Sequence, residues 1–323
     1  DKYGLKAMLL RSSLGIAIVV SAIGFVHSVY QLVWLRFLQG TISGFYSGAI
    51  TLIATQTPRE RAGWALGTLS TASVGGMLFG PLFGGYLSEA FGFRSVFFST
   101  GVLLMIAFLL SLCFVQEHFT VTQEKVLSFK EVWKRIPNPG LILTMFVTTF
   151  VLQLALYSIE PIITVYVGQI TQDLSHIALI SGLVFAASGL ASVIAAPRLG
   201  RLSDKIGPHK VMLGALIVAG VLFIPQALVH SPWELIGLRF LLGIATAGLL
   251  PSVNTLLKCS IPDEVAGRAF GFNQSAQFLG TFSGAVLGGQ VAAVFGIHYV
   301  FFVTSLLLLL NAGWVYQRVY KRV

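Results

Sequence analysis

Long, almost unbroken apolar runs extend along this chain, and short polar segments separate them. A helix needs about 20 apolar residues to cross the hydrocarbon core of a bilayer. Continuous runs of that length predict membrane-spanning helices, whereas the strands of a membrane β-barrel would alternate apolar and polar residues. We predict ten spans, at residues 7–28, 31–54, 63–88, 95–115, 140–167, 176–197, 211–229, 233–257, 268–292 and 296–316.

The longest polar segment, residues 116–138, divides the chain into two parts. We predict an N-terminal bundle in residues 1–115, a cytoplasmic linker in residues 116–138 and a C-terminal bundle in residues 139–323. Hydrophobic residues make up 55% of the chain and charged residues 10%, against about 25% charged in ordinary soluble domains. The predicted fold class is therefore an all-α polytopic membrane protein.

The basic residues are distributed unevenly among the loops. When the loops are numbered alternately from the N-terminus, all but three of the 21 lysines and arginines fall in one alternate set. The exceptions are Arg94, in the other set, and Arg36 and Arg239, inside spans. Because cytoplasmic loops are enriched in Lys and Arg, we expect both chain ends and the linker to face the cytoplasm. The net charge of +9 therefore indicates membrane topology and not nucleic-acid binding.

An internal repeat relates the two halves. The segment WLRFLQG at 34–40 aligns with GLRFLLG at 237–243, and beyond a one-residue shift the glycines match at an offset of 204. This arrangement is typical of transporters built from parallel repeats. The second half has two spans before its DKIG loop, whereas the first half has none before DKYG. We therefore expect the chain to be an N-terminally truncated piece of a twelve-span protein.

Residues 67–85 combine a membrane-length apolar run with repeated small residues and one proline. Gly76, Gly80 and Gly84 are four residues apart and form one smooth stripe on a helix, with Pro81 beside it. Small residues of this kind let two membrane helices approach closely. We therefore expect the stripe to contact a partner helix.

These residues resemble the twelve-spanner drug:proton antiporters of the major facilitator superfamily, and among them the bacterial multidrug efflux pumps. The fourth-helix signature R-x-x-Q-G is present as Arg36, Gln39 and Gly40. The antiporter signature G-x8-G-x3-G-P-x2-G-G is matched by Gly67, Gly76, Gly80, Pro81, Gly84 and Gly85. The loop signature, which in this family acts as a latch on the cytoplasmic side, is matched by Gly200, Leu202, Asp204, Lys205 and Gly207, with Arg201 beside it and its tail repeated at Asp1 and Gly4. The resemblance implies a major-facilitator fold with helices three to twelve present and proton-coupled efflux by alternating access.

Three ionisable residues inside spans are candidates for proton coupling. Arg36 matches the arginine that the family links to proton transfer, and Arg239 is its repeat partner. Glu160 is the only carboxylate well inside an apolar span, and Pro161 follows it. Charged groups inside a membrane are costly and are often functional. The alternatives are that the arginines extend to the outer surface and that Glu160 lies near the outer end of its span, where water reaches it.

Polar side chains inside the spans are candidates for a substrate cavity. These are Gln153, Tyr157, Asn254, Asn273 and Gln277. Such a cavity would suit an amphiphilic, often cationic or zwitterionic aromatic molecule, because aromatic rings bind cations. The alternative is that the amides only hydrogen-bond across helices.

No residue spacing indicates a metal site, a nucleophile elbow or a Walker loop. We therefore expect no enzyme activity, no cofactor and no metal, and the two cysteines, Cys113 and Cys259, should be free thiols. The predicted function is efflux of amphiphilic drugs from a bacterial plasma membrane by a monomer that exchanges them for protons. An uptake symporter or facilitator of a small nutrient on the same fold, and a non-transporting membrane sensor, remain alternatives.

Overall fold

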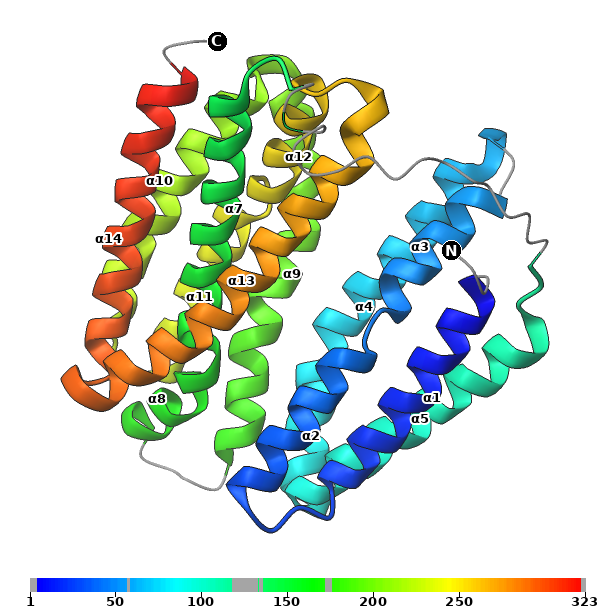
Figure 1. The fold of residues 1–323 in the computed structure, drawn as a ribbon. Coiled ribbons are helices and arrows are strands. Elements are labelled where there is room, and N and C mark those ends of the chain that lie inside the picture. Colours follow the sequence, from blue (N-terminus) through cyan, green and yellow to red (C-terminus); the bar gives the residue numbers. More distant parts are fainter. Residues whose placement is uncertain (1–4, 57–58, 118–132, 134–135, 172–175, 321–323) are drawn as a thin grey trace. The chain divides into compact units, whose positions relative to one another are not determined.

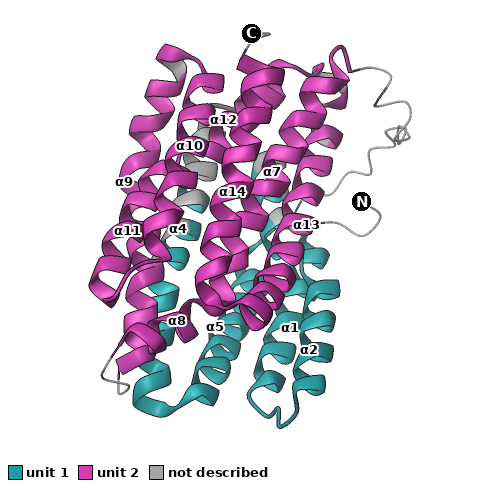
Figure 2. Cartoon of the chain, turned by 90° about the vertical axis from the view of Figure 1, so that its left-hand side faces the viewer, with its two compact units in different colours: residues 1–125 teal, residues 126–323 magenta. Residues whose placement is uncertain are grey.

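The computed structural model describes residues 5–56, 59–117, 133, 136–171 and 176–320. Every regular element in these residues is helical (Figure 1). The chain divides into two compact units, residues 1–125 and 126–323, which Figure 2 colours separately. Most of the predicted linker, and the latch residues Asp1 and Gly4, lie outside the described residues.

Unit 1 contains five helices. Their bounds are α1 Leu5–Ile23, α2 Val29–Ile42, α3 Phe45–Gln56, α4 Arg59–Phe91 and α5 Phe93–Phe114. The helix α1 is central, since it contacts α2, α3 and α5. At the end of α1, a Cβ placed on Gly24 would lie 2.7 Å from the ring of Phe98 on α5, and Phe25 stacks edge-on against that ring at 4.9 Å.

Unit 2 contains the remaining helices. They are α7 Pro139–Ile159, η1 Glu160–Ile162, α8 Ile163–Ile170, α9 Ile177–Ile206, α10 Pro208–Gln226, α11 Pro232–Thr246, α12 Leu249–Cys259, α13 Asp263–Phe295, α14 Ile297–Val315 and the π-helical η3 Tyr316–Tyr320. Their core is continuous, and its largest fully buried side chains are Tyr166, Phe223 and Phe301. These three residues come from α8, α10 and α14, so the core joins helices that are far apart in sequence.

The repeat predicted from the sequence is present in the helix contacts. In unit 1, α1 contacts α2, α3 and α5, while α4 contacts α3 and α5. In unit 2, α10 contacts α11, α12 and α14 in the same way, while α13 contacts α12 and α14. Among the described residues, unit 1 has no counterpart of α7, which packs along α13 and α14 in unit 2.

Two of the predicted continuous spans are broken helices. Residues 31–54 divide at Ser43 and Gly44 into α2 and α3, and residues 233–257 divide at Ala247 and Gly248 into α11 and α12. Gly44 has a φ of 145°, which is outside the helical region. In the second break, the proline at position 251 cannot donate a hydrogen bond to the carbonyl of Ala247. The breaks fall where the repeat offset changes, so they are a shared feature of both halves.

Eight segments of the described structure are long and apolar enough to span a membrane. They include the joined pairs α7–α8 and α11–α12, in which one span consists of two shorter helices.

Two Phe-Gly pairs form the sharp turns that end α4 and α13. Gly92 and Gly296 occupy equivalent repeat positions and have positive φ angles of 83° and 100°. This region of backbone conformation is accessible almost only to glycine. Each glycine lets the next helix begin at once on the other side of the turn.

Replacing Gly296 with alanine is expected to destabilise the protein by about 1–3 kcal/mol, the usual cost of a side chain in this backbone region. Gly313→Ala is the matched control, because Gly313 is helical and a Cβ there meets nothing within 4 Å among the described residues. Thermal denaturation in detergent should show a lower midpoint for Gly296→Ala alone. Equal midpoints would contradict the strained turn.

Candidate functional site

A buried arginine and a partly exposed carboxylate in unit 2 interact electrostatically. Arg239, in the middle of α11, is 6% exposed, and its Nε and Nη2 atoms have no hydrogen-bond partner in the described structure. Glu160, at the junction of α7 and η1, interacts electrostatically with this guanidinium while part of its surface stays exposed. A buried guanidinium that lacks hydrogen bonds depends strongly on such a counter-charge. The structure thus joins two of the three candidate proton-coupling residues.

The irregular backbone at Glu160 has a local cause. Pro161 has no N–H group, so it cannot continue the hydrogen bonding of α7. The chain passes through the short 3-10 helix η1 before α8 begins. The Glu160 carboxylate therefore lies at the break between α7 and α8, where a small backbone change can move it.

The third candidate, Arg36, lies in a different environment. It is exposed on α2, a helix without buried residues, and its Nη1 donates to Gln39 Oε1 at 3.0 Å. Arg36 and Gln39 of the fourth-helix signature are thus hydrogen-bonded to each other. The repeat partners Arg36 and Arg239 have equivalent sequence positions but opposite burial. The helix α11 packs against α9, whereas unit 1 has no described helix in the place of α9.

Two pairs of amide side chains connect helices of unit 2. Gln153 Nε2 donates to Gln277 Oε1 across α7 and α13 at 3.4 Å, and Asn273 Nδ2 donates to Asn254 Oδ1 across α13 and α12 at 3.3 Å. Asn273 is 1% exposed, and its Oδ1 has no partner in the described structure. The amides do bond across helices, which was the alternative to a cavity. Their role in substrate binding stays a prediction.

Tyr157 lies between Gln153 and Glu160 along the chain, on the same side of α7. It lies one helical turn after Gln153 on α7, and it interacts electrostatically with Glu160. Both Gln153 and Tyr157 are half-buried. Gln153, Tyr157 and Glu160 therefore form a partly accessible polar strip on one side of α7.

The glycine stripe of the second half makes close helix contacts. A Cβ on Gly280, Gly284 or Gly288 of α13 would collide with backbone carbonyls of α7, at Phe150, Leu154 and Ser158 respectively. Figure 1 shows α7 and α13 side by side. Small residues at four-residue intervals are what permits such an approach in a membrane.

The equivalent stripe in α4 makes no such contact. A Cβ on Gly76 or Gly80 meets no atom of the described structure within 4 Å, and one on Gly84 reaches only Val96 Cγ1 at 3.9 Å. Within the described part of unit 1, Gly76 and Gly80 therefore do not press on a partner helix as expected, since only α3 and α5 contact α4 there. Gly85 is buried and Pro81 is half-buried within α4. The functional role of the motif stays a prediction.

The predicted latch in the second half is mostly helical. The span predicted at 176–197 continues as α9 to Ile206, so Gly200 to Lys205 extend the helix beyond its apolar part. Arg201 and Lys205 are exposed. Gly207 alone forms the turn, with a φ of 96°, between α9 and α10. The polar sequence suggested a loop, but helical hydrogen bonding does not stop where the apolar run stops.

Buried hydroxyl contacts along α14 were not predicted. Ser158 Oγ and Thr304 Oγ1 lie 2.9 Å apart, Ser305 Oγ donates to the Gly220 carbonyl at 2.7 Å, and Thr148 Oγ1 donates to Asn311 Oδ1 at 3.4 Å. The polar residues within the apolar run of α14 could have predicted these contacts from the sequence. Their spacing marks the face of α14 that packs on α7 and α10.

Membrane-length helices in two units with the same contact pattern define a polytopic membrane protein of the repeat-transporter class. Residues 1–197 and 162–322 match the family model described as Major Facilitator Superfamily. The multidrug resistance protein MdtG of Dickeya zeae (strain Ech586) is 47% identical over 321 residues, which are 98% of this chain and 79% of that protein. MdtG of Salmonella typhimurium (strain LT2) is 45% identical over 323 residues, which are 100% of this chain and 80% of that protein.

A solved structure has the same fold. It is the crystal structure of a bacterial homologue of the human lysosomal transporter Spinster, in an inward-facing and unoccupied conformation. Its TM-score is 0.74 at 14% identity, and the match covers 98% of this chain and 83% of that chain. The chain belongs to the Major Facilitator Superfamily, in the group of multidrug efflux proteins. It is accordingly a multi-pass membrane transporter and not an enzyme.

Proposed function

We propose that this protein exports amphiphilic drugs across a bacterial plasma membrane in exchange for protons, by alternating access. The observation that carries the proposal is the pairing of Glu160 with the buried Arg239. The similarity to multidrug resistance proteins supports the choice of substrate class. The distribution of Lys and Arg supports an orientation with both chain ends in the cytoplasm.

The proposed coupling follows from the electrostatics of the pair. When Glu160 is ionised, it supplies the counter-charge that the Arg239 guanidinium needs in its low-dielectric surroundings. When a proton binds to Glu160, this stabilisation is lost, and conformations in which Arg239 finds water or other acceptors become more populated. The break at Pro161 lets the carboxylate respond without unfolding α7. Arg36, bonded to Gln39, is proposed to act in the same process from the first half.

The proposed substrate site is the polar strip on α7 with the amides beside it. The Glu160 carboxylate attracts cationic molecules, Tyr157 offers a ring for cation–π contact, and the Gln153 and Gln277 amides offer both donors and acceptors. A cationic drug and a proton would then compete for one carboxylate. Such competition is what antiport requires, because the two ligands must not be carried together. We propose that the protein acts as a monomer. We also propose that Gly200, Asp204 and Gly207 belong to a latch on the cytoplasmic side.

Transport by the purified chain in proteoliposomes tests the proposal. An acid interior should drive accumulation of a cationic dye inside the vesicles, and collapse of the gradient with a protonophore should abolish it. Dye expelled together with protons would indicate a symporter. Dye movement that ignores the gradient would indicate a facilitator, and binding without flux would indicate a sensor. Any of these three results would reject the proposed antiport.

A further inference from the structure

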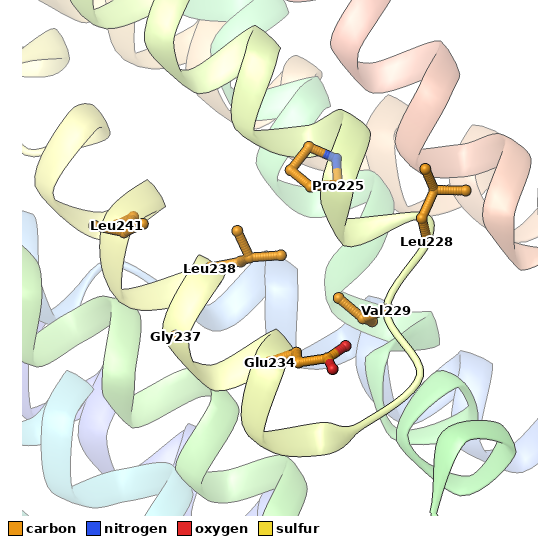
Figure 3. A pocket seen from close by; sticks show the side chains of 7 residues that line it. All are labelled: Pro225, Leu228, Val229, Glu234, Gly237, Leu238 and Leu241. Carbon is orange, nitrogen blue, oxygen red and sulfur yellow. The ribbon is translucent and has the colours of Figure 1, made fainter.

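An apolar groove with one carboxylate lies at the end of unit 2 where α10 connects to α11. Its volume is about 540 Å³, and its walls include Leu228, Val229, Leu238 and Leu241 (Figure 3). Glu234 is the one charged side chain among its lining residues. Figure 3 shows its carboxylate extending from α11 toward Val229.

A groove of about 480 Å³ occupies the repeat-equivalent place in unit 1, where α1 connects to α2. Six of its lining residues precede residues of the first groove by 203 positions. They are Ala22, Phe25, Val26, Gln31, Trp34 and Leu35. The decisive difference is that Gln31 stands where the second half has Glu234. The chain therefore contains a charged groove and an uncharged version of it.

The fold requires an acceptor oxygen at this position but not a charge. Glu234 Oε2 accepts a hydrogen bond from the backbone N–H of His230 at 3.0 Å. Gln31 Oε1 accepts the equivalent bond from the backbone N–H of His27 at 3.1 Å. An amide therefore serves the helix start as well as a carboxylate does. The negative charge of Glu234 is favourable in the first turn of α11, but the hydrogen bond itself does not require it.

The surroundings of Glu234 make a lipid the occupant that fits best. Leu228, which lines the groove, is 60% exposed, and Trp233, next to Glu234 on α11, is 70% exposed. A tryptophan at a helix end is typical of the headgroup boundary. A carboxylate at this level can pair with a cationic headgroup.

We infer that this groove binds a zwitterionic phospholipid with an ethanolamine headgroup, whose ammonium contacts Glu234 and whose acyl chain lies along the leucine walls. A primary ammonium has three N–H donors for the carboxylate, whereas a choline headgroup has none. The inference needs only that the chain is embedded in a bilayer, so it stands or falls independently of the proposed transport activity.

Lipid retention measured on the purified chain tests this inference. The protein is reconstituted with equal amounts of ethanolamine and choline phospholipids that have identical acyl chains, then repurified, and the retained lipids are quantified by mass spectrometry. The wild type should be enriched in the ethanolamine lipid. Glu234→Gln should lower this enrichment by roughly two- to fivefold, the range expected for one partly exposed ion pair.

The repeat supplies the matched variant. Gln31→Glu adds a carboxylate to the uncharged groove and should raise the enrichment, and the double variant should lie near the wild type. Glu234→Gln is expected to fold normally, because Gln31 performs the same capping bond. Equal enrichment in wild type and Glu234→Gln would overturn the inference. The inference would also be overturned if the wild type retained the cationic dye in a Glu234-dependent way but showed no enrichment of the ethanolamine lipid. The occupant of the groove would then be a drug.

Discussion

The Gly284→Leu variant is expected to lose most of its stable packing between α7 and α13 and to denature in detergent at a markedly lower temperature than the wild type. A Cβ at position 284 would lie 2.5 Å from the carbonyl oxygen and 3.0 Å from the Cα of Leu154. Backbone atoms of a packed helix cannot rotate away as a side chain can. Overpacking commonly costs about 1–3 kcal/mol, and a contact made with backbone should reach or exceed the upper end of that range.

The same helix provides the control for this experiment. Gly289 lies one turn further along α13, and a Cβ there meets nothing within 4 Å in the described structure. Gly289→Leu should therefore denature close to the wild-type temperature. Gly80→Leu, at the repeat equivalent of Gly284 in α4, should also be tolerated in this structure. Equal denaturation temperatures for Gly284→Leu and Gly289→Leu would show that α7 and α13 do not meet as described.

The Glu160→Gln variant is expected to lose gradient-driven dye transport by at least about tenfold, the change that corresponds to roughly 1.4 kcal/mol. Glutamine keeps the shape of the side chain but cannot bind and release a proton. The wild-type rate should vary between about pH 6 and about pH 8, whereas the residual rate of the variant should not. Dye flux into acid-loaded proteoliposomes measures both effects.

Controls separate this role from a general loss of stability. Glu117 accepts hydrogen bonds from the backbone N–H groups of Leu5 and Lys6 at 2.7 and 2.8 Å, outside the proposed site. Glu117→Gln should keep its pH-dependent transport. A Glu160→Gln protein that transports like the wild type over the whole pH range would exclude the proposed coupling.

A double-mutant cycle gives a readout that does not depend on transport. Glu160→Gln leaves the Arg239 guanidinium without its counter-charge, and Arg239→Gln leaves the carboxylate without its partner. The double variant should be less destabilised than the two single losses together, with a coupling free energy of about 0.5–3 kcal/mol. Strict additivity in thermal denaturation would mean that the two groups do not interact.

Several features of the fold could be predicted from residue patterns. The apolar runs predicted the helical segments, and the repeat predicted the shared contact pattern of α1 to α5 and α10 to α14. The Phe-Gly pairs at Gly92 and Gly296 recur at equivalent turns. The signatures around Arg36 and Gly80 led to the right superfamily. All of these features depend on neighbours in sequence, where local hydrogen bonding and span length are encoded.

The helix ends and breaks were predicted less well. The pattern of apolar residues did not reveal the break of α2 from α3 at Gly44, nor the continuation of α9 to Ile206. Hydropathy reports where a helix leaves the hydrocarbon, and this is a different property from where its hydrogen bonding stops. A proline or a glycine with positive φ can interrupt a span that is uniformly apolar.

Local sequence was therefore sufficient for the membrane-spanning character, the repeat and the superfamily, because each follows from residues that are close along the chain. Burial and partnership were decided only by tertiary packing. Arg36 and Arg239 share a motif, yet only Arg239 is enclosed, and Gly80 and Gly284 share a stripe, yet only Gly284 meets a helix backbone. The reason is that two helices far away in sequence have no described equivalents in unit 1. They are α7, which supplies the carbonyls opposite the glycines, and α9, which packs against α11 beside Arg239.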